Sequence, residues 1–330
     1  MGTLAARFLT DLARVLPEGL RPGESLALAV SGGPDSMAML ALTHAALPGR
    51  IVAATVDHGL RGESAAEAEQ VATACATLAV PHVTLRPDTP ITGGNMHAAA
   101  RVVRYALLGR WAVSIGAPAL ATAHHADDQA ETFLMRAVRG AGPAGLAGIR
   151  ARRDTADGPI IVRPLLGWRR TELADVAAAA GLPVIADPSN DDQRFERARV
   201  RRLLSATPWL DVNGLADAAR HAGEADAALE AVHAWLWRSR TVTPTEVSDP
   251  EQERWLDMAD LPREVCRRLA REAIRSVRAA SGGAALERAT NIEPLLDALA
   301  QGRAATQADV LVTPCGAVWR FLPAPPRRYP

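Results

Sequence analysis

The first half of this chain alternates short apolar runs with helix-forming segments, and this alternation restricts the fold more than any other feature. Four apolar runs predict strands, at residues 26–30, 51–56, 82–85 and 119–123. The segments between and after them predict helices, at residues 37–46, 63–79, 95–115 and 127–139. This order indicates a Rossmann-like α/β fold, a parallel sheet with helices on both faces. The carboxyl ends of its strands meet at one edge, where such sheets bind ligands.

The second half has a different character, because helical patterns replace the β-branched runs after residue 204. Its clearest helical segments are at residues 220–238, 262–280 and 292–300. The end of the chain, VLVTPCGAVWRFLPAPP, predicts a short hairpin and a Pro-rich tail. Turn-forming residues in SATPWLDVNG mark a boundary. We therefore expect an α/β domain over residues 1–205 and a smaller, mainly helical domain over residues 206–330.

Composition limits the chemistry that the chain can perform. Its 330 residues are 48% hydrophobic and 22% charged, as in globular proteins, and the formal net charge is zero. All 37 basic residues are arginine. A mechanism that needs a protein lysine, such as a Schiff base or a Walker A loop, is therefore excluded.

Cysteine use and hydropathy indicate the compartment. Cys75, Cys266 and Cys315 are far apart and suggest neither a disulfide framework nor a structural zinc site. No apolar run reaches the roughly 18 residues of a membrane span, and the N-terminus resembles an amphipathic helix rather than a signal peptide. We expect a cytoplasmic, reduced protein, and the sequence leaves its oligomeric state open, a homodimer included.

The loop SGGPDS, residues 31–36, joins the first predicted strand to the first predicted helix. Its glycines let the backbone approach an anion, the helix N–H groups point at it, and Ser31 and Ser36 add hydroxyl donors. A pyrophosphate fits such a loop, but so does a plain Ser/Gly/Pro turn with Asp35 near a helix N-cap. As a ligand loop it would need a cation between Asp35 and the phosphates, which suggests Mg²⁺.

The segment TAHHADDQAETFLMRAVRG, residues 122–140, also follows a predicted strand and begins a helix. Asp128 and Glu131 are three residues apart, and Asp127 and Glu131 four, so their side chains share a helix face. Carboxylates there favour a cationic substrate or a metal, although acidic residues in a first helical turn also simply complement the helix dipole. His124 and His125 could act as ligands or bases, but a histidine pair at a strand end is more often structural.

Two groups of arginines suggest phosphate binding. In GGNMHAAARVVRYALL, Asn95 is a candidate N-cap, and Arg101 and Arg104 lie a turn apart where they could grip phosphates or remain solvated. A denser cluster in ADPSNDDQRFERARVRRLL comprises Arg194, Arg197, Arg199, Arg201 and Arg202. In a chain of zero net charge this cluster predicts a nucleotide clamp or a surface for a phosphate backbone, with a solvated face as the alternative.

Together these segments resemble one family. SGGPDS is similar to the PP-loop of the N-type ATP pyrophosphatases, which implies an adenine nucleotide α-hydrolase-like fold. TAHHADDQAET, RGAGPAGLAGI, VRPLL and ADPSN…FERARVR follow in the order found in tRNA(Ile)-lysidine synthases. The resemblance covers residues 24–204, and NIEPLLDALAQG is more weakly similar to the second domain of the family. We expect no further C-terminal domain of the kind that longer members carry, so the chain resembles a short form.

The resemblance implies a ligase that uses ATP and Mg²⁺ in two steps. O2 of cytidine-34, in the CAU anticodon of tRNA(Ile), is adenylated and pyrophosphate leaves. The ε-amine of free lysine then attacks C2, and AMP leaves. The resulting lysidine pairs with A instead of G, which changes the identity of the tRNA from methionine to isoleucine.

The resemblance also implies roles for particular residues. Asp57, in TVDHGLR, would lie near the nucleotide, and Arg101 and Arg104 would neutralise phosphates. Asp128 and Glu131 would receive the lysine ammonium, and one of them would remove a proton, because only the neutral amine attacks. The ATP phosphates would be held by Ser31, Gly32, Gly33, Pro34, Asp35, with its Mg²⁺, and Ser36. Nucleotide or tRNA phosphates would be contacted by Arg194, Arg197, Arg199, Arg201 and Arg202.

The sequence differs from the family pattern at two positions, and three alternative functions are compared with the residues. His97 stands where the family usually has Glu, and Ala198 where it usually has Asn, so local contacts there would differ. A PP-loop tRNA thiolase usually needs paired cysteines or an iron–sulfur cluster, for which these cysteines are too scattered. A small-molecule PP-loop ligase would not need the arginine cluster. An inactive nucleotide- or RNA-binding module would not need the acidic residues Asp35, Asp128 and Glu131.

Overall fold

The computed structural model describes residues 2–59, 62–91, 96–156, 158–185, 194–242, 252–284, 286 and 290–325, with only the backbone of His97. The chain forms two compact units, Met1–Glu224 (unit 1) and Ala225–Pro330 (unit 2). This division falls within helix α9, Val212–Arg240. The domain boundary expected at residues 205 and 206 coincides instead with the end of helix α8, and as a boundary of function it stays a prediction.

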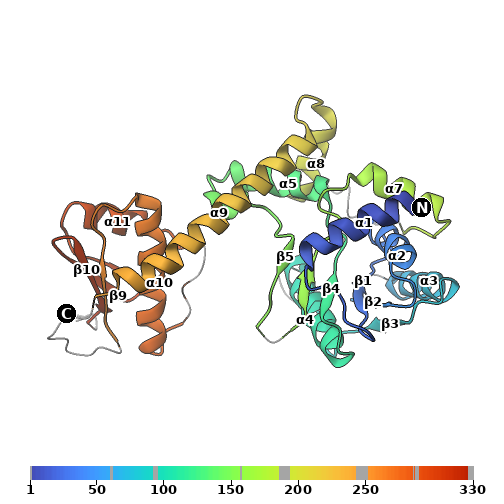
Figure 1. The fold of residues 1–330 in the computed structure, drawn as a ribbon, viewed down its shortest axis with the longest axis horizontal. Helices are drawn as coiled ribbons and strands as arrows, with labels where there is room; N and C mark the ends of the chain where they lie inside the picture. Colours follow the sequence, from blue (N-terminus) through green and yellow to red (C-terminus); the bar gives the residue numbers. More distant parts are fainter. Residues whose placement is uncertain are drawn as a thin grey trace. The chain divides into compact units, whose positions relative to one another are not determined.

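Unit 1 contains the predicted α/β sheet (Figure 1). Its strands are β1 Leu26–Ala29, β2 Ile51–Val56, β3 His82–Leu85, β4 Ala119–Ala121, β5 Arg152–Arg153 and β6 Ile160–Val162. The sheet order is β3-β2-β1-β4-β6-β5, and all neighbours are parallel except β5 and β6. From β1 the chain first adds β2 and β3 on one side and then crosses to add β4 on the other side. Doubly wound sheets bind ligands at such a switch point, here between β1 and β4.

Helices cover both faces of this sheet. The described helices of this unit are α1 Gly2–Val15, α2 Pro34–Ala46, α3 Ser64–Thr77, α4 Met96–Ser114, α5 Ala126–Ala137, α6 Pro143–Leu146, α7 Arg170–Ala179 and α8 Glu196–Ala206, followed by the start of α9. Helices α1, α2, α3, α4 and α7 belong to the layers on the sheet, whereas α6 and α8 pack on α5. Because side chains alternate along a strand, Leu26 and Leu28 of β1 enter the core beneath α1, α2, α3 and α7. The intervening Ala27 enters the opposite core, which α4 covers with Leu108 and Ala112.

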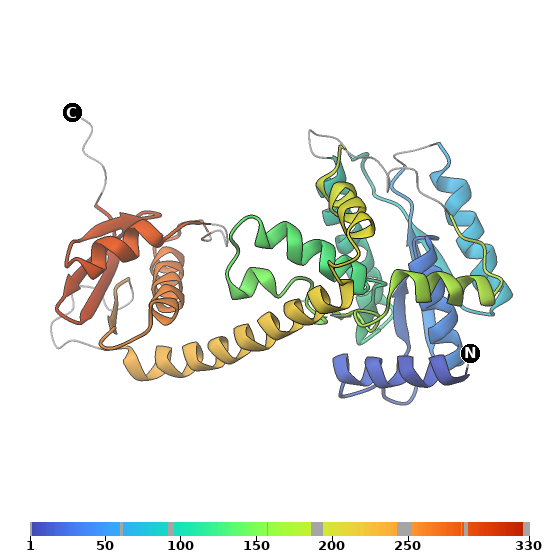
Figure 2. The same cartoon turned by 90° about the horizontal axis from the view of Figure 1, so that it is seen from above.

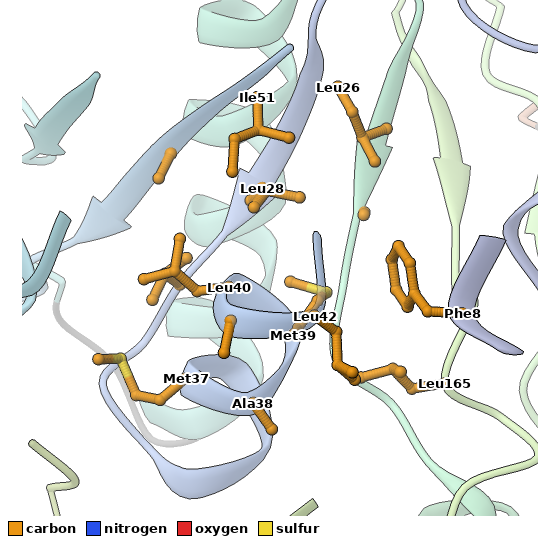
Figure 3. Packing of buried hydrophobic residues seen from close by; sticks show 14 of the residues in the cluster. Phe8, Leu26, Leu28, Met37, Ala38, Met39, Leu40, Leu42, Ile51 and Leu165 are labelled. Carbon is orange, nitrogen blue, oxygen red and sulfur yellow. The ribbon is translucent and has the colours of Figure 1, made fainter. Parts of the chain in front are cut away.

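Helix α2 is the central helix of unit 1. Its residues 36–43 are all buried, and its apolar side chains lie among the strands, Phe8 of α1 and Leu165 (Figure 3). A helix that is apolar on all sides is typical of a protein interior. Burial of each Leu or Met stabilises the fold by about 1.5–3 kcal/mol, so the start of this helix is firmly held.

Unit 2 combines the expected helices with an antiparallel sheet. Helices α10 Arg263–Ala280 and α11 Glu293–Ala300 match the sequence predictions. The strands are β7 Arg254–Asp257, β8 Ala305–Gln307, β9 Val310–Cys315 and β10 Val318–Pro323, in the order β7-β10-β9-β8. The predicted hairpin is β9–β10, and β7 and β8 extend it. The Pro-rich tail beyond residue 325 lies outside the described residues.

Two expectations about the chain as a whole can be compared with the structure. No helix among the described residues is long and apolar enough to cross a membrane. Cys75 is buried, Cys266 half-buried and Cys315 exposed, and all three are free thiols. Burial raises the pKa of the Cys75 thiol to about 11, so this thiol stays protonated and unreactive at neutral pH.

Candidate functional site

The residues singled out in the sequence gather where three neighbouring strands end. Strand β1 pairs with β2 on one side and with β4 on the other, in parallel. The 31–36 loop follows β1, Asp57 follows β2, and His124 and His125 follow β4. Because parallel strands point the same way, these segments emerge at one edge of the sheet. The predicted meeting of the motifs is therefore confirmed at the level of the backbone.

The 31–36 loop is built around the Ser36 hydroxyl. Ser36 Oγ accepts a hydrogen bond from the Ser31 backbone N–H (3.1 Å), lies 3.2 Å from Ser31 Oγ and donates to the Gly33 carbonyl (3.0 Å). Gly33 is the N-cap of α2 and Pro34 follows it, so no side chain caps the first amides of the helix. Such amides carry the positive end of the helix dipole. The loop therefore offers backbone donors suited to an anion.

Gly32 is required by its surroundings. Its φ is +84°, and a Cβ built there would lie 2.3 Å from Cδ1 of Ile185. The Gly32 carbonyl also accepts a hydrogen bond from the Ile185 N–H (2.9 Å). Segment 182–185, which follows α7, thus closes over the loop and leaves no room for a side chain.

Asp35 has the properties of a cation ligand. Its Oδ1 atom is buried and has no hydrogen-bond partner among the described residues. A buried carboxylate oxygen left unsatisfied is costly unless a ligand completes it. Mg²⁺ prefers one or two carboxylates together with substrate phosphates, so this oxygen, beside an anion-binding loop, fits such an ion. No group of three or more His, Cys, Asp or Glu side chains that could hold a metal ion occurs among the described residues.

His125 connects Asp35 to the acidic helix. It is fully buried as the N-cap of α5, and its Nε2 lies 3.3 Å from Asp35 Oδ2 and 3.6 Å from Asp128 Oδ2. Neither contact is aligned as a hydrogen bond, and Nε2 has no such partner in the described part of the chain. Burial lowers the pKa of His125, but the Asp35 and Asp128 carboxylates outweigh it and raise the pKa above the ordinary value.

His124 behaves in the opposite way. Its Nδ1 lies 2.9 Å from the Thr122 hydroxyl, and burial lowers its pKa to about 3 despite the nearby Asp128. The arginines Arg163, Arg101 and Arg197 contribute to this lowering of the pKa. His124 is therefore neutral at physiological pH, whereas the pKa of His125 is raised because its Nε2 lies close to two carboxylates.

Asp128 and Glu131 lie on one face of α5, as predicted. Asp128 Oδ1 is 3.8 Å from Arg197, and Glu131 Oε1 accepts from Arg201 (2.8 Å) and Arg170 (3.3 Å). Burial raises the pKa of Asp128, but His125, His124 and Arg197 outweigh it and lower the pKa. Glu131 is only 1% exposed, and its Oε2 atom, 3.6 Å from Arg197, lacks a hydrogen bond. The Oε2 atom of Glu131 therefore has capacity for a further hydrogen-bond donor.

Asp127 has a structural role that the sequence left open. Its carboxylate accepts from the Arg170 backbone N–H (2.8 Å) and from the Arg169 guanidinium (3.2 Å). Burial raises the pKa of Asp127, but these donors from Arg169 and Arg170 outweigh it and lower the pKa. Asp127 thus fastens the start of α7 to α5, and Arg170 also reaches Glu131. Sequence reasoning missed this function of Arg169 and Arg170, because only chain folding brings them to α5.

Four arginines of the predicted cluster divide between two faces of α8, which runs alongside α5 (Figures 1 and 2), and Arg194 precedes this helix. Arg197 and Arg201 face α5: Arg197 donates to Thr132 (3.1 Å) and Arg201 to Glu131. The other three, Arg194, Arg199 and Arg202, are exposed. The cluster is therefore not one continuous basic surface, and its assignment to phosphates stays a prediction.

Asp57 and the arginines of α4 occupy the other flank. Asp57 is buried, and its carboxylate accepts from the Gly59 N–H (3.0 Å) and from Arg86 (3.0 Å). Arg104 donates to Nε2 of His58 (3.3 Å), the residue after Asp57, whereas Arg101 lies 5.1 Å from the Tyr105 ring centre. Arg104 is thus tied to the β2 edge, while Arg101 stacks on its own helix.

Several sequence predictions fall on residues without a described structure. Asn95 as a helix N-cap lies outside the described residues, as does the side chain of His97. Ala198 lies half-buried within α8. The consequences of these two departures therefore stay predictions.

Comparisons with known proteins show which sequences are similar to this chain. The PP-loop domain family matches residues 4–207. A tRNA(Ile)-lysidine synthase of Zymomonas mobilis is 42% identical over 92% of this chain and 89% of its own length. One of Novosphingobium aromaticivorans is 41% identical over 98% of this chain and 95% of its own.

A solved structure is also similar to this chain. A U34-tRNA thiolase from Methanococcus maripaludis, with its 4Fe-4S cluster, superposes with a TM-score of 0.56 at 17% identity. The superposition covers 67% of this chain and 78% of the thiolase. At this identity the likeness concerns the fold alone.

Proposed function

This chain belongs to the tRNA(Ile)-lysidine synthase family, ligases that join lysine to cytidine-34 of tRNA(Ile) using ATP, and we propose how its residues divide that reaction among them. The observation that carries the proposal is a continuous row of side chains. It runs from Asp35 in the anion-binding loop through His125 and Asp128 to Arg197 and Glu131. Each neighbour in the row lies within 3.8 Å of the next. The row joins a site for phosphates to a site for an amine.

The first step uses the loop end of this row. The amides of the 31–36 loop and the start of α2 would bind the phosphates of ATP, and Asp35 would hold Mg²⁺. When bound, the ion would neutralise phosphate charge and favour departure of pyrophosphate. O2 of cytidine-34 attacks the α-phosphorus, a P–O bond to pyrophosphate breaks, and the base carries an AMP group on O2.

The second step uses the acidic end. The unsatisfied Oε2 of Glu131 and the carboxylate of Asp128 would accept the lysine ammonium. One of these carboxylates then removes a proton, so that the neutral amine forms a bond to C2 of the base. The C2–O2 bond breaks and AMP leaves with the oxygen. Arg197, between the two carboxylates, would move to the departing phosphate as the ammonium replaces it.

The test follows the fate of lysine. The protein is incubated with Mg²⁺, ATP, labelled lysine and a tRNA(Ile) transcript with the CAU anticodon, and label in RNA, AMP and pyrophosphate are measured. We expect one lysine and one AMP for each tRNA, and no label in a transcript with U in place of C34. Absence of label with the CAU transcript would refute the function.

A matched pair of variants tests the role of the acidic helix. Asp128→Asn should raise the KM for lysine with little change in the KM for ATP, because the lost charge faces the amine site. Asp175→Asn, an exposed aspartate on α7, is the control and should behave as the wild type. Equal effects of Asp128→Asn on both KM values would show that the assignment is wrong.

A further inference from the structure

The two faces of α8 differ in what they contact. Its inner face carries Arg197, Val200, Arg201 and Leu204, at the spacing of one helix stripe. Val200 and Leu204 pack with Ala126 and Ala130 of α5, while the two arginines reach the carboxylates of the site. This face is therefore occupied by the catalytic unit itself.

The outer face of α8 is open to solvent. Arg199, Arg202, Leu203 and Ala206 form its exposed stripe, and Leu203 is 50% exposed. Three residues beyond the helix, Trp209 is 81% exposed, although its neighbour Leu210 packs on the α5 cluster. The Leu210 N–H donates to the Thr207 carbonyl (2.9 Å), so the turn that carries the indole is an ordered one.

We propose that this outer surface, Arg199, Arg202, Leu203 and Trp209, binds the single-stranded anticodon loop of the tRNA, with Trp209 as a stacking platform for a base beside cytidine-34. The proposal rests on the function proposed above. Single-stranded RNA is recognised by aromatic side chains that stack on splayed bases, combined with arginines that follow the backbone. This surface presents both kinds of group within one short segment.

Position supports an anticodon loop as the occupant. The reacting base must reach Asp128 and Glu131, which contact the inner face of the same helix. A helix with its side chains is about 10–12 Å across, so nucleotides on either side of the reacting base come within reach of the outer face. The charge of Arg199 and Arg202 matches phosphates and not another basic surface.

Exposure of one indole does not by itself indicate a binding surface, because single apolar residues are common on protein surfaces. Trp235 of α9 illustrates this, since it is 61% exposed in unit 2. Trp209 differs in its place, directly after the basic stripe of the helix that lines the site. Trp235→Ala is therefore the matched control for Trp209→Ala.

Direct binding provides the test. The dissociation constant of the full chain is measured for an anticodon stem–loop of tRNA(Ile) and for a duplex of the same stem without the loop. Base–aromatic stacking predicts that Trp209→Ala weakens binding of the stem–loop by about 5- to 150-fold, and Trp209→Phe by much less. Trp235→Ala should leave the constant unchanged, and the duplex should not distinguish the variants.

Salt dependence separates the two kinds of contact. Arg202→Gln should reduce the slope of log affinity against log salt by about 1, whereas Trp209→Ala should leave the slope unchanged. Unchanged stem–loop binding by Trp209→Ala would overturn the proposal. So would an equal loss on the duplex, or dissociation of a dimer by Trp209→Ala without loss of RNA binding, which would assign the surface to a second copy of the chain.

These measurements do not depend on catalysis. A wild-type protein that binds the stem–loop through Trp209 but transfers no lysine would refute the proposed function and leave the binding surface in place. A protein that transfers lysine equally well with Trp209→Ala, at the same KM for tRNA, would refute only the surface.

Discussion

Arginine–carboxylate contacts occur in both units, but they are completed in different ways. In unit 2, Glu293 of α11 accepts from Arg267 of α10 at one oxygen and from Arg263 of α10 at the other. Arg268 likewise donates to Asp226 and Glu264. At the strand ends of unit 1, Asp35 Oδ1 and Glu131 Oε2 are buried without hydrogen bonds. Among the described residues of unit 2, no buried carboxylate oxygen is left in that state.

This difference separates a stabilising network from a binding site. A carboxylate whose oxygens already accept hydrogen bonds has little capacity for a further ligand. A buried oxygen without a partner costs free energy until a ligand supplies a donor or a cation. We therefore interpret the same residue types as supporting the fold in unit 2 and, as proposed above, as binding substrates in unit 1.

The largest expected effect comes from Asp35. Asp35→Asn keeps the shape but removes the charge proposed to hold Mg²⁺, so we expect pyrophosphate release to fall by at least about 100-fold, since such charge stabilisation is worth several kcal/mol. Pyrophosphate is measured with tRNA saturating. Rates within a few-fold of the wild type would contradict the proposed difference between the two units, because the unsatisfied oxygen of Asp35 would then bind no ligand that the reaction needs.

Glu131→Gln should have the next largest effect, with consequences for both activity and stability. The change removes the partner of Arg201, Arg170 and Arg197, and we expect the midpoint of thermal unfolding to fall as well as lysine transfer. The double variant Glu131→Gln/Arg201→Met removes one uncompensated charge and should recover part of the stability without recovering transfer. Recovery of both would make Glu131 a purely structural residue.

His124 and His125 are neighbours in unit 1, and we expect them to titrate differently. Without Mg²⁺ and ATP, imidazole NMR shifts should show that His124 stays neutral until pH about 3, while His125 titrates above 6.5. The stabilisation from charged His125 is present below pH 6.5 and is lost as the pH rises through its raised pKa. That from neutral His124 is present above pH 6.5 and is lost as the pH falls toward 3. Parallel titration of both residues would contradict the geometry.

The smallest effect is expected in unit 2. Arg267 and Arg263 lower the pKa of Glu293 to about 2 from 4.5. Because the side chain is 40% exposed, Glu293→Gln should cost only about 1 kcal/mol of unfolding free energy. This loss should be visible above pH 4.5 and should vanish as the pH falls toward 2. Lysine transfer should be unchanged, and a loss of transfer would show that the network is more than a stabilising one.

Local patterns were enough to predict how the site is assembled. The apolar runs before Ser31, Asp57 and His124 are buried strands, and parallel pairing brings their ends together. The spacing of Asp128 and Glu131 predicts a shared helix face, and both residues contact Arg197. These predictions rest on strand and helix periodicity, which acts over a few residues.

Long-range contacts could not be predicted in this way. Arg169 and Arg170 reach Asp127 across more than forty positions of sequence, and the tie depends on where α7 begins. The arginines around residue 199 read as one cluster, although helical phase sends Arg201 inward and Arg202 outward. Strand β5 has two residues, too few for a pattern, and it exists through its pairing with β6.

The division of the site into a phosphate end and an amine end is tested most directly by comparing the two substrates in one variant. Steady-state rates of lysine transfer to tRNA(Ile) are measured for the wild type and Asp128→Asn, first with lysine varied and then with ATP varied. For Asp128→Asn we expect the KM for lysine to rise at least about tenfold, the equivalent of 1.4 kcal/mol. The KM for ATP should change by less than about twofold. Equal rises in both constants, or none in the KM for lysine, would contradict the division of the site into a phosphate end and an amine end.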